Sequence, residues 1–210
     1  MVQVGGVPII EHHLRWLQAN GIERAILLTG YLSNVIADYF AQPRLESLLV
    51  ECIAETQPLG RGGAFKNGYM QTNLTDDLVV ATNGDVLTNQ PLDELLAVHQ
   101  STKALATIML APMISPFGIV ETDGSLVTAF SEKPALPYQV NGGVYLLSRE
   151  AIERFPELGD HETESFPSMA SEGRLAGMKS SGFWKSIESR KDIIEGEQLL
   201  ATYPLNAANR

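Results

Sequence analysis

Leu78-Val79-Val80-Ala81-Thr82 is an uninterrupted run that ends directly in the polar tripeptide Asn83-Gly84-Asp85. Continuous runs of this kind are typical of a central parallel strand that is covered on both faces. In open α/β sheets, ligands bind beyond the carboxyl ends of such strands. The stretch therefore predicts an α/β sheet, and it places Asp85 at the edge where chemistry is expected.

Helices and strands alternate on both sides of this run through the first half of the chain. Apolar residues recur at helical spacing after residues that favour a helix start, and short apolar runs lie between them. The predicted helices begin near Pro8, Ser33, Gly62 and Pro91, and the predicted strands cover residues 25–29, 50–54 and 104–111. This alternation is typical of a doubly wound, Rossmann-like core.

The second half of the chain has an antiparallel character. Residues 117–121 and 126–130 flank Thr122-Asp123-Gly124-Ser125, which is a strong hairpin signal. Further strands are predicted at 140–147, 175–179 and 184–187, and further helices at 149–154, 164–171 and 191–200. We therefore expect a single domain over residues 1–210, with a mixed sheet and an added antiparallel hairpin.

The composition is that of an ordinary globular domain: 210 residues, 44% apolar, 19% charged, with a net charge of −10. The Lys and Arg residues form no cluster, which argues against nucleic acid or an anionic membrane surface as the main partner. No secretory signal or membrane-length apolar run is seen, so the cytoplasm is the expected location. The single cysteine, Cys52, lies in an apolar run and is expected to be a buried strand residue.

Asp85 is the sharpest candidate for chemistry. A hard carboxylate directly after a buried strand suits Mg²⁺ that is bridged to phosphate oxygens. Asn-Gly-Asp is also ordinary turn chemistry, and the tripeptide alone leaves both interpretations open.

The loop Pro58-Leu59-Gly60-Arg61-Gly62-Gly63-Ala64 lies between a predicted strand and a predicted helix. Its glycines would let backbone N–H groups approach a ligand, and the helix N-terminus favours an anion or a base edge. The alternative is a flexible connection, and the loop does not match a P-loop.

Two more stretches combine polar groups with unusual backbone. Glu132-Lys133-Pro134 ends a predicted strand, where the lysine could neutralise a sugar phosphate and the glutamate could accept sugar hydroxyls; a solvated turn is the alternative. Asn141-Gly142-Gly143 puts two glycines inside a strand, which fits either a ligand packed against the backbone or a bulge.

Taken in order, these motifs resemble those of the sugar-1-phosphate nucleotidyltransferases, also called NDP-sugar pyrophosphorylases. The resemblance runs from Met1 to about Leu200. The motifs that carry it are Gly30-Tyr31-Leu32, Glu55 to Ala64, Asn83 to Asp85, Phe117-Gly118, Glu132 to Pro134, Asn141 to Tyr145 and Gly182 to Trp184.

The resemblance implies a reaction and a role for each motif. A sugar-1-phosphate oxygen would attack the α-phosphorus of a nucleoside triphosphate and release pyrophosphate, with catalysis by positioning and charge neutralisation. Residues 1–111 would form the nucleotide-binding half and residues 112–210 the sugar-binding half. The implied residues are Asp85 for Mg²⁺, Lys133 for the sugar phosphate, Pro58, Leu59, Gly60, Asn83 and Gly84 for the nucleotide, and Gly118, Glu132, Asn141 and Gly142 for the sugar.

The chain departs from the family pattern at two places. The family's first strand, with a glycine-rich phosphate loop and a Pro-Lys-Pro segment, is missing before Met1, so weak or absent turnover is expected of this chain. Ser186 stands where the family commonly has a second aspartate that binds metal. Glu188 lies about 6–7 Å further along an extended strand and could replace it, or it could be a surface acid.

Two other functions stay open on the sequence alone. The missing loop and Ser186 also fit a catalytically inactive homologue that senses a sugar nucleotide. A glycosyltransferase is less favoured, because that class usually has an Asp-x-Asp motif after the central strand. The base, the sugar and the oligomeric state, a homo-oligomer included, are not fixed by the sequence.

The remaining polar residues are expected to be structural or solvated. His12 and His13 point in different directions on one helix and do not form a metal pair. His99 and His161 are expected to be solvated. An acidic stretch around a predicted helix start is expected to be a solvated helix cap; it consists of Glu157, Asp160, Glu162 and Glu164.

Overall fold

The computed structural model describes residues 1–203 and 205, apart from residues 43, 46 and 73. The helices are α1 (Ile9–Ala19), α2 (Ser33–Phe40), α3 (Gly60–Gln71), α4 (Leu92–Thr102), α5 (Arg149–Glu153), α6 (Ser165–Ser171) and α7 (Arg190–Thr202). The strands are β1 (Gln3–Val4), β2 (Val7–Pro8), β3 (Arg24–Thr29), β4 (Leu49–Ala54), β5 (Leu78–Thr82), β6 (Val86–Thr88), β7 (Ala106–Ile114), β8 (Ile119–Asp123), β9 (Leu126–Ser131), β10 (Ala135–Ser148), β11 (Leu175–Lys179) and β12 (Trp184–Ser186).

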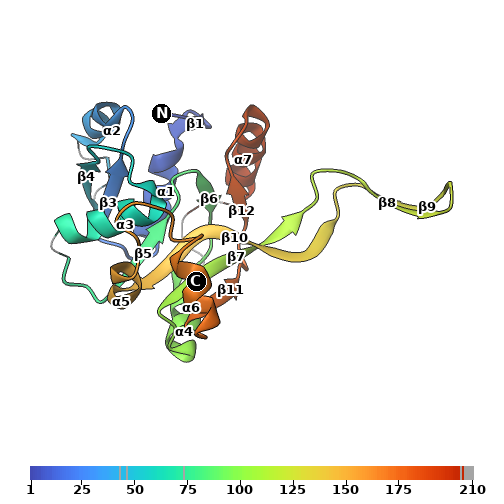
Figure 1. Ribbon diagram of the computed structural model, residues 1–210. Coiled ribbons are helices and arrows are strands. Elements are labelled where there is room, and N and C mark those ends of the chain that lie inside the picture. Colours follow the sequence, from blue (N-terminus) through green and yellow to red (C-terminus); the bar gives the residue numbers. More distant parts are fainter. Residues whose placement is uncertain (43, 46, 73, 204, 206–210) are drawn as a thin grey trace.

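The strands form a mixed architecture, as the sequence predicts. A four-stranded sheet has the order β11-β7-β10-β5, in which β11 is parallel to β7 while β10 is antiparallel to both of its neighbours. A separate parallel pair joins β3 and β4, and a short antiparallel pair joins β6 and β12. Figure 1 shows β3 and β4 to one side of the long strands β7 and β10, within the same body.

The position predicted for β5 is wrong in one respect. The strand lies at the edge of its sheet and pairs with β10 in the antiparallel sense, so it is not a central parallel strand. Coverage on both faces is nevertheless found: Leu78 and Val80 pack on the cluster that contains Leu14 of α1, whereas Val79 and Ala81 pack on the cluster that contains Tyr69 of α3. Burial on two faces explains the continuous apolar run and does not require parallel neighbours.

The strand β3 lies in the same layer as β5. Ala25 and Leu27 join the cluster of α1. On the opposite face, Leu28 lies against Gly68 of α3, where a Cβ atom would collide with the leucine side chain. Among the described residues, β3 pairs only with β4 and β5 pairs only with β10, so each strand has one unpaired edge.

Several element boundaries differ from those predicted. Helix α2 begins at Ser33 itself after Leu32, whose φ of 58° is left-handed, and Ser33 is therefore not its cap. Helix α3 begins at Gly60 rather than Gly62. Strand β6 was not predicted, because three residues carry no readable period. Cys52 lies in β4 as expected, although it is only half-buried.

The predicted hairpin is present as β8 and β9, at the end of an arm that projects from the body (Figure 1). The outer parts of β7 and β10 form the root of this arm. Every residue of β8 and β9 is exposed. Val120 lies opposite Phe130, and Thr122 lies opposite Val127, so one face of the hairpin is largely apolar.

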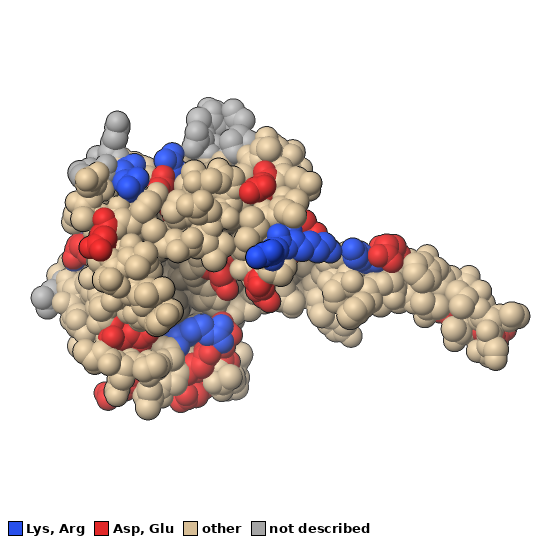
Figure 2. Space-filling model, turned by 90° about the horizontal axis from the view of Figure 1, so that it is seen from above, with Lys and Arg blue, Asp and Glu red and all other residues tan. Residues whose placement is uncertain are grey.

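On the face shown in Figure 2, the Lys and Arg side chains of the described residues stand among acidic and uncharged ones and do not merge into a broad basic surface. Within the described part of the chain, none of the helices combines the length and the apolar character that crossing a membrane requires.

Candidate active site

The loop Asn83–Asp85 joins β5 to β6, and its backbone is held from several sides. The Asn83 N–H donates to the Gly143 carbonyl at 2.8 Å. The Asp85 carbonyl accepts from the Ile187 N–H at 2.9 Å. Gly84 and Asp85 are exposed, and among the described residues the Asp85 carboxylate makes no hydrogen bond or ion pair. The loop thus presents an unpaired anionic group on a fixed backbone.

The end of β12 lies against this loop. Ser186 pairs with Val86 in the β6–β12 ladder, so the segment after β12 runs past Asp85. The Ser186 hydroxyl donates to the Glu188 carboxylate at 3.0 Å. Ser186 thus contacts Glu188, and the residue between them, Ile187, is the one whose N–H donates to the Asp85 carbonyl. These oxygen groups are of the type that binds a hard divalent cation.

A bulge in β10 forms the third side of the site. The register against β7 shifts between Asn141 and Tyr145, and Gly143 has a φ of 69°, which favours glycine. A Cβ atom at Gly143 would lie 2.8 Å from the Asn83 side-chain nitrogen, so a larger residue would displace the Asn83 amide as well as strain the backbone. The Trp184 indole N–H also donates to the Gly142 carbonyl at 2.8 Å. Three segments distant in sequence, 83–85, 141–143 and 184–188, thus converge.

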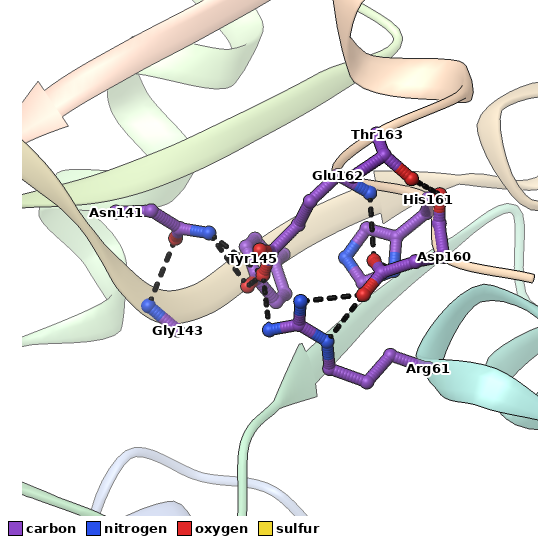
Figure 3. Close-up of polar contacts among 8 residues, drawn as sticks. All are labelled: Arg61, Asn141, Gly143, Tyr145, Asp160, His161, Glu162 and Thr163. Carbon is purple, nitrogen blue, oxygen red and sulfur yellow. Dashed lines mark hydrogen bonds and ion pairs between the residues drawn. The ribbon is translucent and has the colours of Figure 1, made fainter.

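The Asn141 side chain is engaged within the protein (Figure 3). Its amide nitrogen donates to the Tyr145 hydroxyl at 3.0 Å and to the Glu162 carboxylate at 2.9 Å, and its oxygen accepts from the Gly143 N–H at 2.9 Å. These bonds fix the bulge that touches Asn83. Burial raises the pKa of Tyr145, with the Glu162 carboxylate adding to the shift, so the phenol stays protonated.

Arg61 extends this network to the first turn of α3 (Figure 3). Its guanidinium donates to Glu162 at 2.8 Å and to Asp160 through Nε at 2.8 Å. Partial burial opposes ionisation of Asp160, but the Glu162 N–H and the Arg61 guanidinium outweigh it and lower its pKa. The predicted nucleotide loop and the β10 bulge are therefore tied together by charge-assisted hydrogen bonds.

The glycines of the predicted nucleotide loop have a packing role. Cβ atoms at Gly60 and Gly63 would collide with the Gly159 and Glu157 carbonyls, and the N–H groups of Gly62 and Gly63 donate to Gly159 at 3.1 and 3.3 Å. These amides are thus used inside the protein. Pro58 and Gly60 are exposed and Leu59 is half-buried, so part of this loop faces solvent beside the network.

The other predicted sugar and phosphate residues lie on the projecting arm. A Cβ atom at Gly118 would be 3.1 Å from a Glu132 carboxylate oxygen, so these two residues share one face of the hairpin. Lys133 is exposed, with a φ of 46°, and lies between β9 and β10. Figure 1 shows this part of the chain out along the arm, whereas β6 lies in the body. The assigned roles of Glu132 and Lys133 remain predictions.

Sequence reasoning missed several residues of this region. His161 is fully buried and His99 is 9% exposed, so the prediction that they are solvated is wrong. Asp160 and Glu162 pair with Arg61 and do not form a solvated cap. His13 is buried and bonds to both ends of the Asn83–Asp85 loop. The partners of His13 and of Arg61 lie about 70 and 100 residues away in sequence, so no local pattern marks them.

A second group of potential metal ligands consists of Asp160, His161 and Glu162, whose ligand atoms lie within 4.8 Å of one another. Both carboxylates are already bonded to Arg61. Because that guanidinium supplies the compensating positive charge, the loop with Asp85 is the better candidate for a cation.

Comparison with known proteins identifies the family to which the sequence is similar. The sequence model of the family described as "Nucleotidyl transferase" matches residues 1–202. A curated relative named mannose-1-phosphate guanylyltransferase, from Mycobacterium tuberculosis, is 33% identical over 93% of this chain and 56% of its own length. A probable glucose-1-phosphate cytidylyltransferase of Bacillus subtilis is 29% identical over 93% of this chain and 85% of its own length. The chain thus spans little more than half the length of the first of these relatives.

Solved structures share the fold. HddC from Yersinia pseudotuberculosis, crystallised in complex with GMP-PN, superposes with a TM-score of 0.76 at 22% identity, covering 94% of this chain and 88% of the other. A UDP-glucose pyrophosphorylase from Acinetobacter baumanii superposes with a TM-score of 0.72 at 21% identity, covering 97% of this chain and 86% of the other.

Proposed function

Because the chain belongs to the nucleotidyl transferase family, we propose that it transfers a nucleotidyl group from a nucleoside triphosphate to a sugar-1-phosphate, giving an NDP-sugar and pyrophosphate. The convergence of the loop Asn83–Asp85 with the β10 bulge and the end of β12 carries this proposal. Relatives that are named for guanylyl and cytidylyl transfer to sugar phosphates support the same reaction class. The reaction takes place in the cytoplasm, without nucleic acid or a membrane as partner.

Asp85, with Glu188 as the second carboxylate, is the group that would hold Mg²⁺. The fit rests on an exposed, unpaired carboxylate whose backbone is fixed beside Ser186 and Glu188. A cation held by these carboxylates would supply positive charge to compensate that of the phosphate groups. The chain's own residues would position the reactants: the exposed part of Pro58–Gly60, with Asn83 and Gly84, would contact the nucleotide, and Asn141–Gly142 would line the sugar site. The attacking phosphate is already an anion, so no general base is required.

Because Lys133, Glu132 and Gly118 lie on the arm, they can act on the substrates only if the arm reaches the Asn83–Asp85 loop. An extended strand rises about 3.3 Å per residue, so the stretch from Lys133 to Gly143 spans up to roughly 30 Å. For Lys133 to bind the sugar phosphate, the arm bends towards the loop at the register shift between Ala135 and Gln139. Lys133 would also reach an Asn83–Asp85 loop in a homo-oligomer, if the arm of one copy extends to the loop of the other copy. Light scattering of the eluted protein separates the two arrangements.

The test is pyrophosphate release from mixtures of each nucleoside triphosphate with a set of sugar-1-phosphates and Mg²⁺. It is run on the chain and on a version extended at its N-terminus by the expected strand and glycine-rich loop. We expect Asp85→Asn to lower the rate of the active version by at least about 100-fold, because the metal's charge stabilisation is lost. Asp123→Asn, which removes an exposed carboxylate at the hairpin tip, is the matched control. Full activity in Asp85→Asn would refute the metal assignment.

Binding of nucleotide and sugar phosphate without turnover in either version would favour a sensing homologue. Ser186, which is expected to stand at the position of the family's second aspartate, motivates this alternative. Isothermal titration of the same ligands measures it.

A further inference from the structure

His13 spans the mouth of the Asn83–Asp85 loop. Its imidazole Nδ1 lies 3.0 Å from the Val86 carbonyl, and its Nε2 lies 2.8 Å from the Thr82 hydroxyl. Thr82 is the last residue of β5 and Val86 is the first residue of β6. One ring therefore bonds to the residue on either side of the loop that carries Asp85.

The ring itself is held rigidly by α1. His13 is 6% exposed, and its ring stands edge-on to Trp16 at 5.1 Å with an interplanar angle of 72°. The Trp16 indole N–H is anchored in turn on the Gln90 carbonyl at 2.8 Å. The bridge between the loop ends is thus part of the packed core, and it cannot swing away with the loop.

The chemistry of the partners fixes the hydrogen positions in the neutral ring. A carbonyl only accepts, so Nδ1 carries the hydrogen that is donated to Val86, and Nε2 is left as an acceptor 2.8 Å from the Thr82 hydroxyl. The single hydrogen of the Thr82 hydroxyl has two acceptors within reach, His13 Nε2 at 2.8 Å and the Asn83 carbonyl at 3.0 Å, and Nε2 is the nearer of the two. A phenylalanine ring at position 13 would remove both bonds and leave the Val86 carbonyl without this donor.

We propose that His13 is a positioning residue for Asp85: it fixes the separation and orientation of the two loop ends, and thereby sets the affinity of the loop for a divalent cation. This inference rests on the proposed function. The other anchors of the loop, Gly143 and Ile187, bond to the loop backbone itself. Among the described residues, the His13 imidazole is the side chain with hydrogen bonds to both Thr82 and Val86.

The test uses the chain as it is and Mn²⁺ alone, with free Mn²⁺ measured by its electron paramagnetic resonance signal. We expect His13→Phe to weaken the Asp85-dependent site by about tenfold, which is the effect of losing one to two hydrogen bonds that organise it. Thr82→Val removes only the hydroxyl partner at nearly constant volume, and it is expected to weaken the site in the same direction.

His99→Phe is the matched control. His99 is also a buried histidine bonded to a threonine, with Nδ1 at 2.9 Å from the Thr107 hydroxyl, but it joins α4 to β7. We expect His99→Phe to lower the melting temperature without changing Mn²⁺ affinity. Unchanged affinity in His13→Phe and Thr82→Val, or an equal loss in His99→Phe, would overturn the inference while leaving the proposed function standing. If Asp85→Asn binds Mn²⁺ as tightly as the wild type, the metal assignment itself fails, and the inference fails with it.

Discussion

His161 is kept neutral by its surroundings. Its ring stacks on Phe155 at 4.8 Å and meets Phe166 edge-on at 4.7 Å, and neither ring nitrogen has a hydrogen-bond partner among the described residues. Burial lowers the pKa of His161 to about 4, against an opposing effect of the Glu162 and Asp160 charges. A group of this kind links folding to pH.

The free energy of unfolding should therefore fall as the pH drops from about 6.5 to about 4. The unfolded chain takes up a proton on His161 in this range while the folded chain does not, so the contribution is fully present above pH 6.5 and is lost below it. The loss amounts to roughly 3 kcal/mol. Urea unfolding at pH 7 and pH 4.5 measures it, and His161→Phe should show a smaller decrease than the wild type. Parallel decreases in both proteins would contradict this origin.

Prediction at the level of single residues succeeded where the signal is local. The loop Asn83–Asp85 follows its strand as expected, and the glycines of Asn141–Gly143 accompany a real bulge. The network of Arg61 with Glu162 was missed because the two residues are 101 positions apart. From sequence alone, a charged side chain is expected to be solvated, because nothing nearby in the chain identifies its ion-pair partner.

At the scale of elements, the arm is the most exposed part of the molecule. Val120, Val127 and Phe130 are 45%, 62% and 65% exposed on the apolar face of the hairpin. No described residue outside the arm is bonded to β8 or β9 through a backbone ladder. Such side chains contribute little to folding if nothing covers them.

We therefore expect the double change Val120→Thr and Phe130→Thr to shift the melting temperature by less than about 2 °C. Val144→Thr, in the fully buried part of β10, is the comparison and should lower it by several degrees, because it buries a hydroxyl. Differential scanning calorimetry measures both. If the arm variant loses as much stability as Val144→Thr, the apolar face is covered in solution, by the body or by a second copy.

Helical spacing and the hairpin signal were sufficient to predict most elements, whereas pairing was not. The apolar run of β5 reports burial on two faces and says nothing about which strand lies beside it. Strand β6 is fixed by its ladder with β12, nearly one hundred residues later, so no local pattern could indicate it.

At the scale of the whole molecule, the sheet is divided. Strands β3 and β5 lie in one layer between α1 and α3, yet each has one unpaired edge among the described residues. The mixed α/β class follows from the alternating pattern of the sequence. The division of the sheet could not be predicted from that pattern, because strand order depends on contacts between segments that are distant in sequence.

Hydrogen exchange should reveal this division. In β3 and β5 roughly every second amide faces the unpaired edge, and we expect these amides to exchange at least about tenfold faster than those of β7, which is paired on both sides. Residue-resolved exchange by NMR measures the difference. Uniformly slow exchange along β3 and β5 would mean that another extended segment is bound between them.

The unpaired edges also decide how this chain behaves in concentrated solution. A strand edge binds backbone rather than side chains, so it accepts almost any extended peptide, including one from a neighbouring molecule. The net charge of −10 keeps neighbours apart through a repulsion that acts over about 10 Å at 0.1 M salt. Ionic strength is therefore expected to set the balance: dilute buffer favours dispersed molecules, and added salt screens the repulsion that keeps their sheets from joining.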